Sequence, residues 1–288
     1  MTSVSDASPK KPLPSITAYS VAVLRAQHQI VDGGSIFKDP LAVCIVGGTD
    51  DSIAQEGHPA LSFPRLRQFV AARSRFAEDT LAKAVARGVR QYVVLGAGFD
   101  TFGLRNPYAD KGLRVFEVDR PLTQSWKRQC AQVANLTIPD SLRLVPVNFE
   151  RESFLDRLAA AGFNMTEPAL FSWLGVVFYL TRNTVRSALA AIAALPDAEI
   201  VFDYSLPPDA VPPRDRVAYK GMMDRAAAAG EPWLSFFTPQ EVKVGLTELR
   251  FTAVEDLGPD EIGRRYFRKG RPMGARLVRA RNRSPKVP

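Results

Sequence analysis

The sequence predicts an α/β fold in which a mostly parallel sheet carries helices on both faces. Two observations support this prediction. Short apolar runs rich in β-branched residues alternate with helical patterns from about residue 90 to residue 205, as is typical of parallel sheets. The hydrophobic content of 46% over 288 residues is ample for one large core. Ligands of such sheets bind at the carboxyl ends of the strands, so the residues that follow each strand are the first candidates for a site.

The N-terminal part of the chain is predicted to be a tail followed by helices. Residues 1–14 are polar and Pro-rich without an apolar run, which predicts a disordered tail rather than a signal peptide. Residues 15–30 form a helical pattern with a capping serine. Residues 39–46 form a short helix with Asp39 as its cap. A third helix covers residues 63–87.

The most informative stretch runs from residue 91 to residue 119. An apolar strand pattern is cut off by Gly96, Ala97 and Gly98, and a second strand pattern ends at Asp119. Glycine adopts positive φ without a Cβ penalty and lets the backbone approach a ligand. An acid about 20 positions after such a turn is typical of a site for a nucleotide ribose. The stretch therefore predicts a nucleotide-type cofactor, with an ordinary strand–turn–helix and a surface acid as the alternative.

The residues after the glycine turn bear on which cofactor is bound. A dinucleotide fingerprint requires a third small residue, and Thr101 stands at that position. Asp100, beside the turn, would repel a pyrophosphate. S-adenosylmethionine has no phosphate and carries a sulfonium and an ammonium group, so a nearby acid is tolerated. The residues favour S-adenosylmethionine over a nicotinamide dinucleotide.

Several motifs occur together in a specific order. They are LGAGFDT from Leu95, FEVDRP from Phe116, W-L-G-V-x-x-Y-L-T from Trp173, Lys38-Asp39-Pro40-Leu41-Ala42 and Gly230-Glu231-Pro232. With them the chain resembles the leucine carboxyl methyltransferase family and its bacterial relatives, from about Ser15 to the C-terminus. The resemblance implies a class I S-adenosylmethionine-dependent O-methyltransferase. It also implies a Rossmann-like, seven-stranded, mostly parallel sheet with an N-terminal helical cap.

The resemblance also implies which residues hold the cofactor. An arginine in the helix before the glycine strand binds the carboxylate of the cofactor's methionine part, and Arg73 stands there. A guanidinium grips a carboxylate through two parallel hydrogen bonds. Gly96, Ala97 and Gly98 would lie against the cofactor, with Asp119 on the ribose. Arg73 on a solvated helix face is the alternative.

Three further candidates follow the third and fourth strands. Asn148 stands where many methyltransferases have Asp, and its carbonyl oxygen can accept a bond from the adenine amine. Phe149 would lie on the adenine face, although Asn148 and Phe149 also fit a turn that caps the next helix. Leu174 stands where some family members carry a cofactor-binding Glu, so only its backbone is expected to line the pocket.

The methyl acceptor is less well specified. Tyr179, Tyr204 and His28 are candidates for substrate binding, with Tyr179 alternatively in the core. The chain has only two histidines. His28 ends the first helix and His58 lies in a loop, and neither belongs to a motif. A carboxylate is already ionised at neutral pH, whereas a hydroxyl needs a base, so the lack of an evident base favours a carboxylate acceptor.

The chain is predicted to form one domain from residue 15 to residue 288. Residues 15–88 are the helical cap and residues 89–204 the cofactor-binding core. Residues 205–249 interrupt the alternation with a Pro-rich start and a helix, and such insertions often carry substrate specificity. Residues 250–288 hold a final pair of strands.

Composition excludes several other classes. The net charge is +8, but the arginines near the C-terminus lie in an alternating strand-like segment without aromatic stacking residues. This indicates a solvated basic face or attraction for an anionic substrate rather than nucleic-acid binding. Cys44 and Cys130 form no close pair and no metal motif, which predicts inert thiols in a reducing cytoplasm. No apolar run is long enough to cross a membrane.

The sequence as a whole predicts a cytoplasmic O-methyltransferase that uses S-adenosylmethionine to methylate a carboxylate of a small molecule or peptide. Three alternatives remain: a hydroxyl O-methyltransferase of secondary metabolism, an NAD(P)-dependent oxidoreductase, and a non-catalytic cofactor-binding protein. No metal is expected. The oligomeric state is not predicted.

Overall fold

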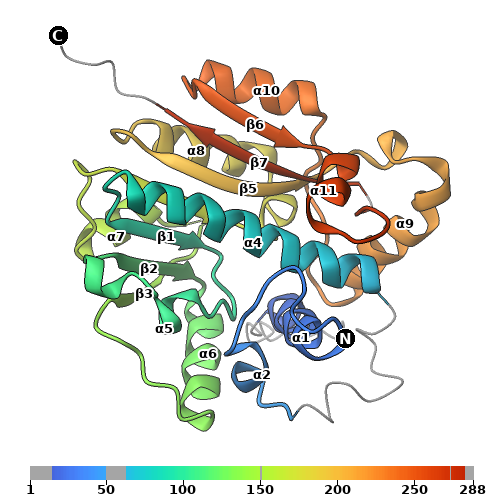
Figure 1. Ribbon diagram of the computed structural model, residues 1–288. Coiled ribbons are helices and arrows are strands. Elements are labelled where there is room, and N and C mark those ends of the chain that lie inside the picture. The colour runs from blue at the N-terminus through green and yellow to red at the C-terminus, as the bar shows by residue number, and fades with distance from the viewer. Residues whose placement is uncertain (1–14, 50–62, 150, 273, 283–288) are drawn as a thin grey trace, which may run out of the picture.

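The structure is a computed structural model that describes residues 15–49, 63–149, 151–272 and 274–282. The expected disordered tail, residues 1–14, and His58 lie outside the described residues. A seven-stranded sheet forms the centre of the described chain (Figure 1). Its strands are β1 (Gln91–Leu95), β2 (Arg114–Asp119), β3 (Leu142–Pro146), β4 (Ala169–Trp173), β5 (Glu199–Ser205), β6 (Ala253–Leu257) and β7 (Ala275–Arg281).

The strand order is β3-β2-β1-β4-β5-β7-β6. The pairs among β1 to β5 are parallel, and β7 runs antiparallel to both β5 and β6. The order reverses between β1 and β4, and open α/β sheets bind ligands at such a switch point. The predicted seven-stranded, mostly parallel sheet is confirmed.

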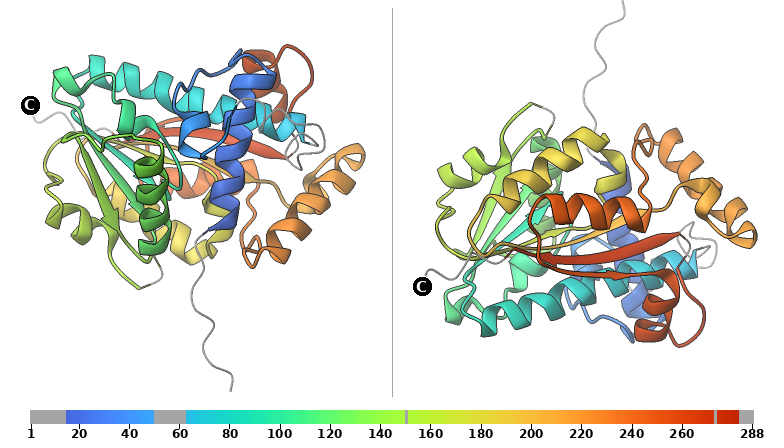
Figure 2. Two further views of the ribbon diagram at one scale, coloured as in Figure 1. Left: turned by 90° about the horizontal axis from the view of Figure 1, so that it is seen from below. Right: turned by 90° about the horizontal axis from the view of Figure 1, so that it is seen from above.

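Helices cover both faces because successive side chains of a strand point to opposite sides. Val93 and Leu95 of β1 join one hydrophobic cluster, and Tyr92 and Val94 join the other. Figure 2 shows α8 and α10 on one face and α4 and α11 on the other. The first cluster is covered by α7 (Phe154–Ala160), α8 (Arg182–Ala193) and α10 (Pro239–Glu248), and the second by α4 (Pro64–Ala86), α5 (Phe102–Arg105) and α11 (Pro259–Tyr266).

Further helices of the described chain lie beside this layered core, among them α1 (Ile16–Val31), α2 (Ala42–Ile45) and α9 (Pro213–Ala228). Helix α1 packs against α2 and α4, and α2 packs against α6 (Pro121–Val133). In Figure 1, α1 and α9 lie at the end of the sheet toward which β1 and β2 point. Both helices are therefore placed beside the carboxyl ends of the parallel strands.

The structure corrects the predicted start of the second helix. Helix α2 begins at Ala42 and its N-cap residue is Leu41, so Asp39 is not the cap. The Asp39 carboxylate is buried instead, 2.8 Å from Arg25 Nε and 2.7 Å from Thr101 Oγ1. Asp39 thus ties α1 to the loop after the glycine turn, a long-range role that local capping rules do not reveal.

Two other boundaries differ from the sequence expectation. Helix α7 begins at Phe154, where the Ser153 side chain accepts a hydrogen bond from the Asp156 N–H, rather than near residue 150. Helix α11 lies between β6 and β7. The last two strands pair with each other and run antiparallel, but helix α11 interrupts the connection between them.

Many arginines of the C-terminal part are paired with acids. Arg276 Nε lies 2.9 Å from Asp256 Oδ1, and Arg281 Nη2 lies 2.9 Å from Asp197 Oδ1. Arg279 pairs with the buried Glu199. The sheet itself thus neutralises part of the positive charge seen in the sequence. Within the described residues, no helix combines the length and apolar character that a transmembrane helix needs.

Candidate functional site

A cavity of about 950 Å³ opens at the carboxyl ends of β1, β2, β4 and β5. This volume lies at the upper end of the range for small-molecule sites, roughly 300–1,000 Å³. Most of the residues predicted to bind a ligand line it, although they come from distant parts of the chain. They are Arg73, Gly96, Ala97, Gly98, Asp119, Asn148, Phe149, Leu174 and Tyr179.

The glycine turn requires its glycines for two reasons. Gly96 has φ +65° and Gly98 has φ +51°, in the left-handed region where a Cβ is unfavourable. A Cβ on Gly98 would also lie 3.1 Å from Ala18 Cβ of α1, and one on Gly96 would lie 2.4 Å from Val176 Cγ2. The turn is therefore packed between α1 and the loop after β4, which bound the cavity on two sides.

Asp119 ends β2 and faces the same turn. Its Oδ2 accepts a hydrogen bond of 2.6 Å from the Gly98 N–H, and its Oδ1 accepts one of 2.6 Å from the Arg120 N–H. Burial raises the pKa of Asp119, while these two hydrogen bonds act in the opposite direction. Each carboxylate oxygen can accept more than one hydrogen bond. The fixed carboxylate can therefore also receive the two hydroxyls of a ribose.

Arg73 lies on α4 and is buried, with 6% of the residue exposed. Its Nη1 donates a hydrogen bond of 2.9 Å to Oδ2 of Asp203, which is 1% exposed at the end of β5. The other Asp203 oxygen, Oδ1, accepts a hydrogen bond of 2.5 Å from the Gly175 N–H. Gly175 has φ +72°, and a Cβ there would lie 2.6 Å from Arg73 Nη2. The guanidinium is thus held between an acid and a glycine.

The residues after β3 and β4 line the cavity as expected. Asn148 follows β3, and its N–H donates a hydrogen bond of 2.9 Å to Glu152 Oε2. Phe149 lies 5.9 Å from Phe154, centroid to centroid, so the ring also packs on α7. Leu174 is half-buried and follows β4. These residues form an apolar wall with one amide, which suits an adenine ring.

Tyr179 lies in a cluster of aromatic rings at the cavity wall. Its ring centroid is 4.6 Å from that of Phe178, and Phe178 is 4.6 Å from Trp233. Burial raises the pKa of Tyr179, against the effect of hydrogen bonds with Thr17 and Trp233. The phenol therefore stays protonated at neutral pH. Trp173, which ends β4, is by contrast fully buried in the hydrophobic core.

Comparison with known proteins decides the family. The model of leucine carboxyl methyltransferases matches residues 18–193, more than half of the chain. The chain belongs to the leucine carboxyl methyltransferase family. This confirms the family predicted from the sequence motifs.

Two relatives illustrate the family. YktD of Bacillus subtilis (strain 168) is 40% identical over 200 residues, which cover 68% of this chain and 65% of YktD. FRAAL3718 of Frankia alni is 32% identical over 197 residues, which cover 62% of this chain and 64% of that protein. Both are named as putative S-adenosyl-L-methionine-dependent methyltransferases. The predicted cofactor is thus the one named for the relatives. The matches span slightly less than two thirds of the length of each relative.

Solved structures resemble the fold as well. A putative methyltransferase from Thermobifida fusca aligns with a TM-score of 0.58 at 15% identity, covering 94% of this chain and 96% of that one. A DUF574 family protein from Streptomyces avermitilis aligns with a TM-score of 0.55 at 17% identity, covering 83% of this chain and 94% of that one. At these identities the likeness concerns the fold alone. It supports the class I methyltransferase architecture of this family member.

Two residues expected in the substrate site do not line the cavity. His28 is fully buried: its Nδ1 lies 2.8 Å from Asp32 Oδ2, and its Nε2 accepts hydrogen bonds from the Ile36 and Phe37 N–H groups at 3.2 and 3.3 Å. With both ring nitrogens engaged, His28 organises the turn after α1 rather than the substrate. Tyr204 is also buried, and its hydroxyl donates a hydrogen bond of 2.9 Å to Asp256 Oδ2. The interpretation of these two residues as substrate contacts is therefore wrong.

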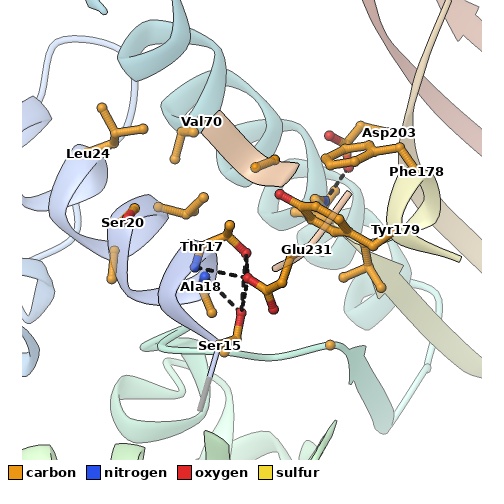
Figure 3. A pocket seen from close by; sticks show the side chains of 18 of the residues that line it. Ser15, Thr17, Ala18, Ser20, Leu24, Val70, Phe178, Tyr179, Asp203 and Glu231 are labelled. Carbon is orange, nitrogen blue, oxygen red and sulfur yellow. Dashed lines mark hydrogen bonds between the residues drawn. The ribbon is translucent and has the colours of Figure 1, made fainter. Parts of the chain in front are cut away.

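Glu231 is a functional candidate whose role the sequence did not reveal. Its Oε2 accepts hydrogen bonds from the Ser15 hydroxyl at 3.2 Å and from the Thr17 N–H at 3.2 Å, and its Oε1 lies 2.9 Å from Arg120 Nη2. Figure 3 shows Glu231 meeting the first turn of α1 at the cavity. Glu231 joins three segments that border the site. More than 200 positions separate it from Ser15 and Thr17, so no spacing rule predicts the contact.

Asp203 was also not predicted, although the sequence contains a signal for it. Three apolar residues, Ile200, Val201 and Phe202, precede Asp203 in the strand E-I-V-F-D-Y-S, and all residues of the strand are buried. A buried acid is costly unless it is paired, and this one stands where a parallel strand nears its carboxyl end. Such an acid in an apolar strand indicates a site. Within the described residues, no cluster of His, Cys, Asp and Glu could hold a metal ion.

Proposed function

We propose that this member of the family is an S-adenosylmethionine-dependent O-methyltransferase that esterifies the carboxylate of an apolar small molecule or peptide. The observation that carries the proposal is one continuous cavity. It joins the cofactor residues at the strand ends to an apolar chamber with arginines at its mouth. Methyl transfer is mainly a matter of positioning two reactants in line, and one cavity with two chemically different halves suits that task.

The cofactor half has the groups that S-adenosylmethionine requires. A buried cation, Arg73, is available for its carboxylate, and the Asp119 carboxylate is available for its ribose. When bound, the cofactor supplies an electrophilic methyl group on a sulfonium. Helix α1 lies directly on the glycine turn through Ala18, which limits the access of water to that group.

The acceptor half is mostly apolar. Helices α1, α4 and α9 border it together with the segment after β4 and the loop after α9. Figure 3 shows Leu24 and Val70 on one side of this space and Phe178 and Tyr179 on the other. We name this space the acceptor chamber and define it by Leu24, Leu66, Val70, Phe178, Met222 and Leu234. Such a lining favours an acceptor with an apolar body.

Positive charge at the mouth favours an acid. Arg65 and Arg225 line the cavity and are exposed. The Arg225 guanidinium lies 4.1 Å from the centroid of the Phe63 ring, a cation–π geometry. Arg65 Nη1 lies 3.2 Å from Asp215 Oδ1. A charged rim of this sign raises the local concentration of an anionic acceptor.

Two features of the described cavity lining also favour a carboxylate acceptor over a hydroxyl. Among the described residues that line the cavity there is no histidine, and the raised pKa of Tyr179 keeps that phenol protonated. A carboxylate is ionised at neutral pH without help, whereas a hydroxyl acceptor needs a proton acceptor within reach.

We also propose that the protein works in the cytoplasm, where the free thiols of Cys44 and Cys130 would stay reduced.

The test is a transfer assay with S-adenosylmethionine that carries a labelled methyl group, run against a panel of aliphatic and aromatic acids and their alcohol counterparts. Alkaline treatment releases a methyl ester as volatile labelled methanol but leaves a methyl ether intact. Alkali-labile label formed only with the acids is the expected result. Alkali-stable label formed with the alcohols would replace the carboxylate proposal with a hydroxyl acceptor. If the protein binds S-adenosylhomocysteine but transfers no label to either group, the acceptor class is wrong.

A further inference from the structure

The Arg73–Asp203 pair is an unusual feature of the cavity wall. Both residues are more than nine-tenths buried, and Arg73 Nη1 lies 2.9 Å from Asp203 Oδ2. A buried ion pair gains little net stability, because removing two charges from water costs about as much as their attraction returns. Stability alone therefore gives no reason to place this pair at a ligand cavity rather than a pair of apolar residues. Its position, with both residues lining the cavity, indicates binding.

We infer that Asp203 binds the ammonium group at the amino-acid end of the cofactor, beside Arg73, the residue already assigned to the carboxylate. The inference rests on the proposed function, since it assumes S-adenosylmethionine in this cavity. An α-amino acid carries its two charges on one carbon atom, so their partners must be neighbours. Arg73 and Asp203 are in direct contact, and each has the charge opposite to one of the two groups.

The pair also has bonding capacity left for a ligand. Only Nη1 of Arg73 has a hydrogen-bond partner among the described residues, and a guanidinium has five donors. Each Asp203 oxygen accepts one hydrogen bond, from Arg73 or from the Gly175 N–H, and can accept another. The backbone bond from Gly175 fixes the plane of the carboxylate. Asp203 is thus oriented before any ligand arrives, which lowers the entropic cost of binding.

The other acids of the cavity are less suitable partners for the ammonium. Asp119 is bound by two backbone N–H groups at the ribose position. Asp100 accepts a hydrogen bond from the Phe102 N–H and lies beyond the glycine turn. Glu231 is occupied by α1 and Arg120. Among these described acids, Asp203 alone is bonded to Arg73, the cation assigned to the carboxylate.

The inference can be tested by changing the ligand and the protein in parallel. Three probes share the nucleoside: S-adenosylhomocysteine, its analogue without the amino group, and methylthioadenosine, which lacks the whole amino acid. Calorimetric titration of the wild-type protein should show S-adenosylhomocysteine binding about 10- to 100-fold tighter than the deaminated analogue, the range expected for a charge-assisted hydrogen bond. In Asp203→Asn this ratio should fall to about threefold or less, while the affinity for methylthioadenosine stays within about twofold.

Asp256→Asn is the matched control, because Asp256 also pairs with an arginine at the sheet but does not line the cavity. It should retain the wild-type ratio between the two probes. Equal wild-type affinity for S-adenosylhomocysteine and its deaminated analogue would overturn the inference without any variant, so it remains testable even if Asp203→Asn does not fold. A ratio that survives in folded Asp203→Asn would overturn it too. Failure of all three probes to bind the wild-type protein would instead refute the proposed function.

Discussion

Replacing Gly175 by alanine tests how Arg73 is positioned. Gly175 has φ +72°, and a non-glycine residue in the left-handed region costs roughly 1–2 kcal/mol. The new Cβ would start 2.6 Å from Arg73 Nη2 and 2.7 Å from Nη1. Ordinary contacts lie near 3.5 Å, so the guanidinium must move by about 1 Å. A shift of that size breaks the 2.9 Å hydrogen bond to Asp203.

We expect Gly175→Ala to lower the affinity for S-adenosylhomocysteine by about tenfold or more, the effect of losing one hydrogen bond to a charged group. The affinity for methylthioadenosine should change little, because that ligand has no carboxylate for Arg73. Calorimetric titration with both ligands measures the difference. The melting temperature should fall by a few degrees, since roughly 1–2 kcal/mol corresponds to about 2–6 °C for a chain of this size.

Gly112→Ala provides the control for backbone strain. Gly112 has φ +77°, close to that of Gly175, but nothing lies within 4 Å of a Cβ placed there. This variant should lose a similar amount of stability and keep the wild-type affinity for both ligands. If Gly175→Ala bound S-adenosylhomocysteine as tightly as the wild-type protein, or lost both ligands equally, the reasoning about Arg73 would be refuted.

Three further predictions concern other parts of the structure. Asp119→Asn should weaken S-adenosylhomocysteine at least tenfold in calorimetry, because the amide cannot accept from both Gly98 and Arg120; unchanged affinity would disprove the ribose assignment. Burial acts to raise the pKa of Asp32, but hydrogen bonds from His28 and Arg67 lower it to about 2. The ionised carboxylate therefore stabilises the folded state above the unfolded pKa near 4, and this stabilisation is lost as the pH falls through about 2. Asp32→Asn should therefore lose about 2 kcal/mol of unfolding free energy at pH 7 and only a small part of that near pH 2, measured by urea unfolding, with wild-type cofactor affinity. For an acid identified in the transfer assay, Arg225→Gln should raise KM several-fold at low salt with kcat unchanged, and an equal KM at all salt concentrations would exclude steering by this residue.

The sequence predicted the sheet and most of its helices because these elements carry local signals. Apolar strand runs, capping residues and glycine stops repeat regularly between residues 90 and 205. The helix α11 was missed because its two apolar side chains, Ile262 and Tyr266, lie among charged residues. The role of Asp39 was missed because its partners Arg25 and Thr101 come from separate segments.

The site was predictable where function is tied to the end of a strand. Gly96 and Gly98 follow β1 and Asp119 ends β2, in a spacing with a chemical reason, and the structure places all three in one cavity. His28 and Tyr204 were misplaced because residue type alone suggested chemistry, whereas burial and hydrogen bonds show structural roles. Contacts such as that of Glu231 with α1 depend on the tertiary fold, which no local pattern encodes.

Part of the acceptor chamber lies outside the stretch that matches the family model. Helix α9 and the segment around Leu234 border the chamber, yet both lie after residue 193, where the match to the family model ends. Arg73, Asp119 and the glycine turn lie within the matched stretch. Substitutions on α9 can therefore reshape the chamber without touching a group that holds the cofactor. Under the proposed function, two family members that share one methyl donor would differ in their acceptors, and exchanging α9 between them would transfer that choice.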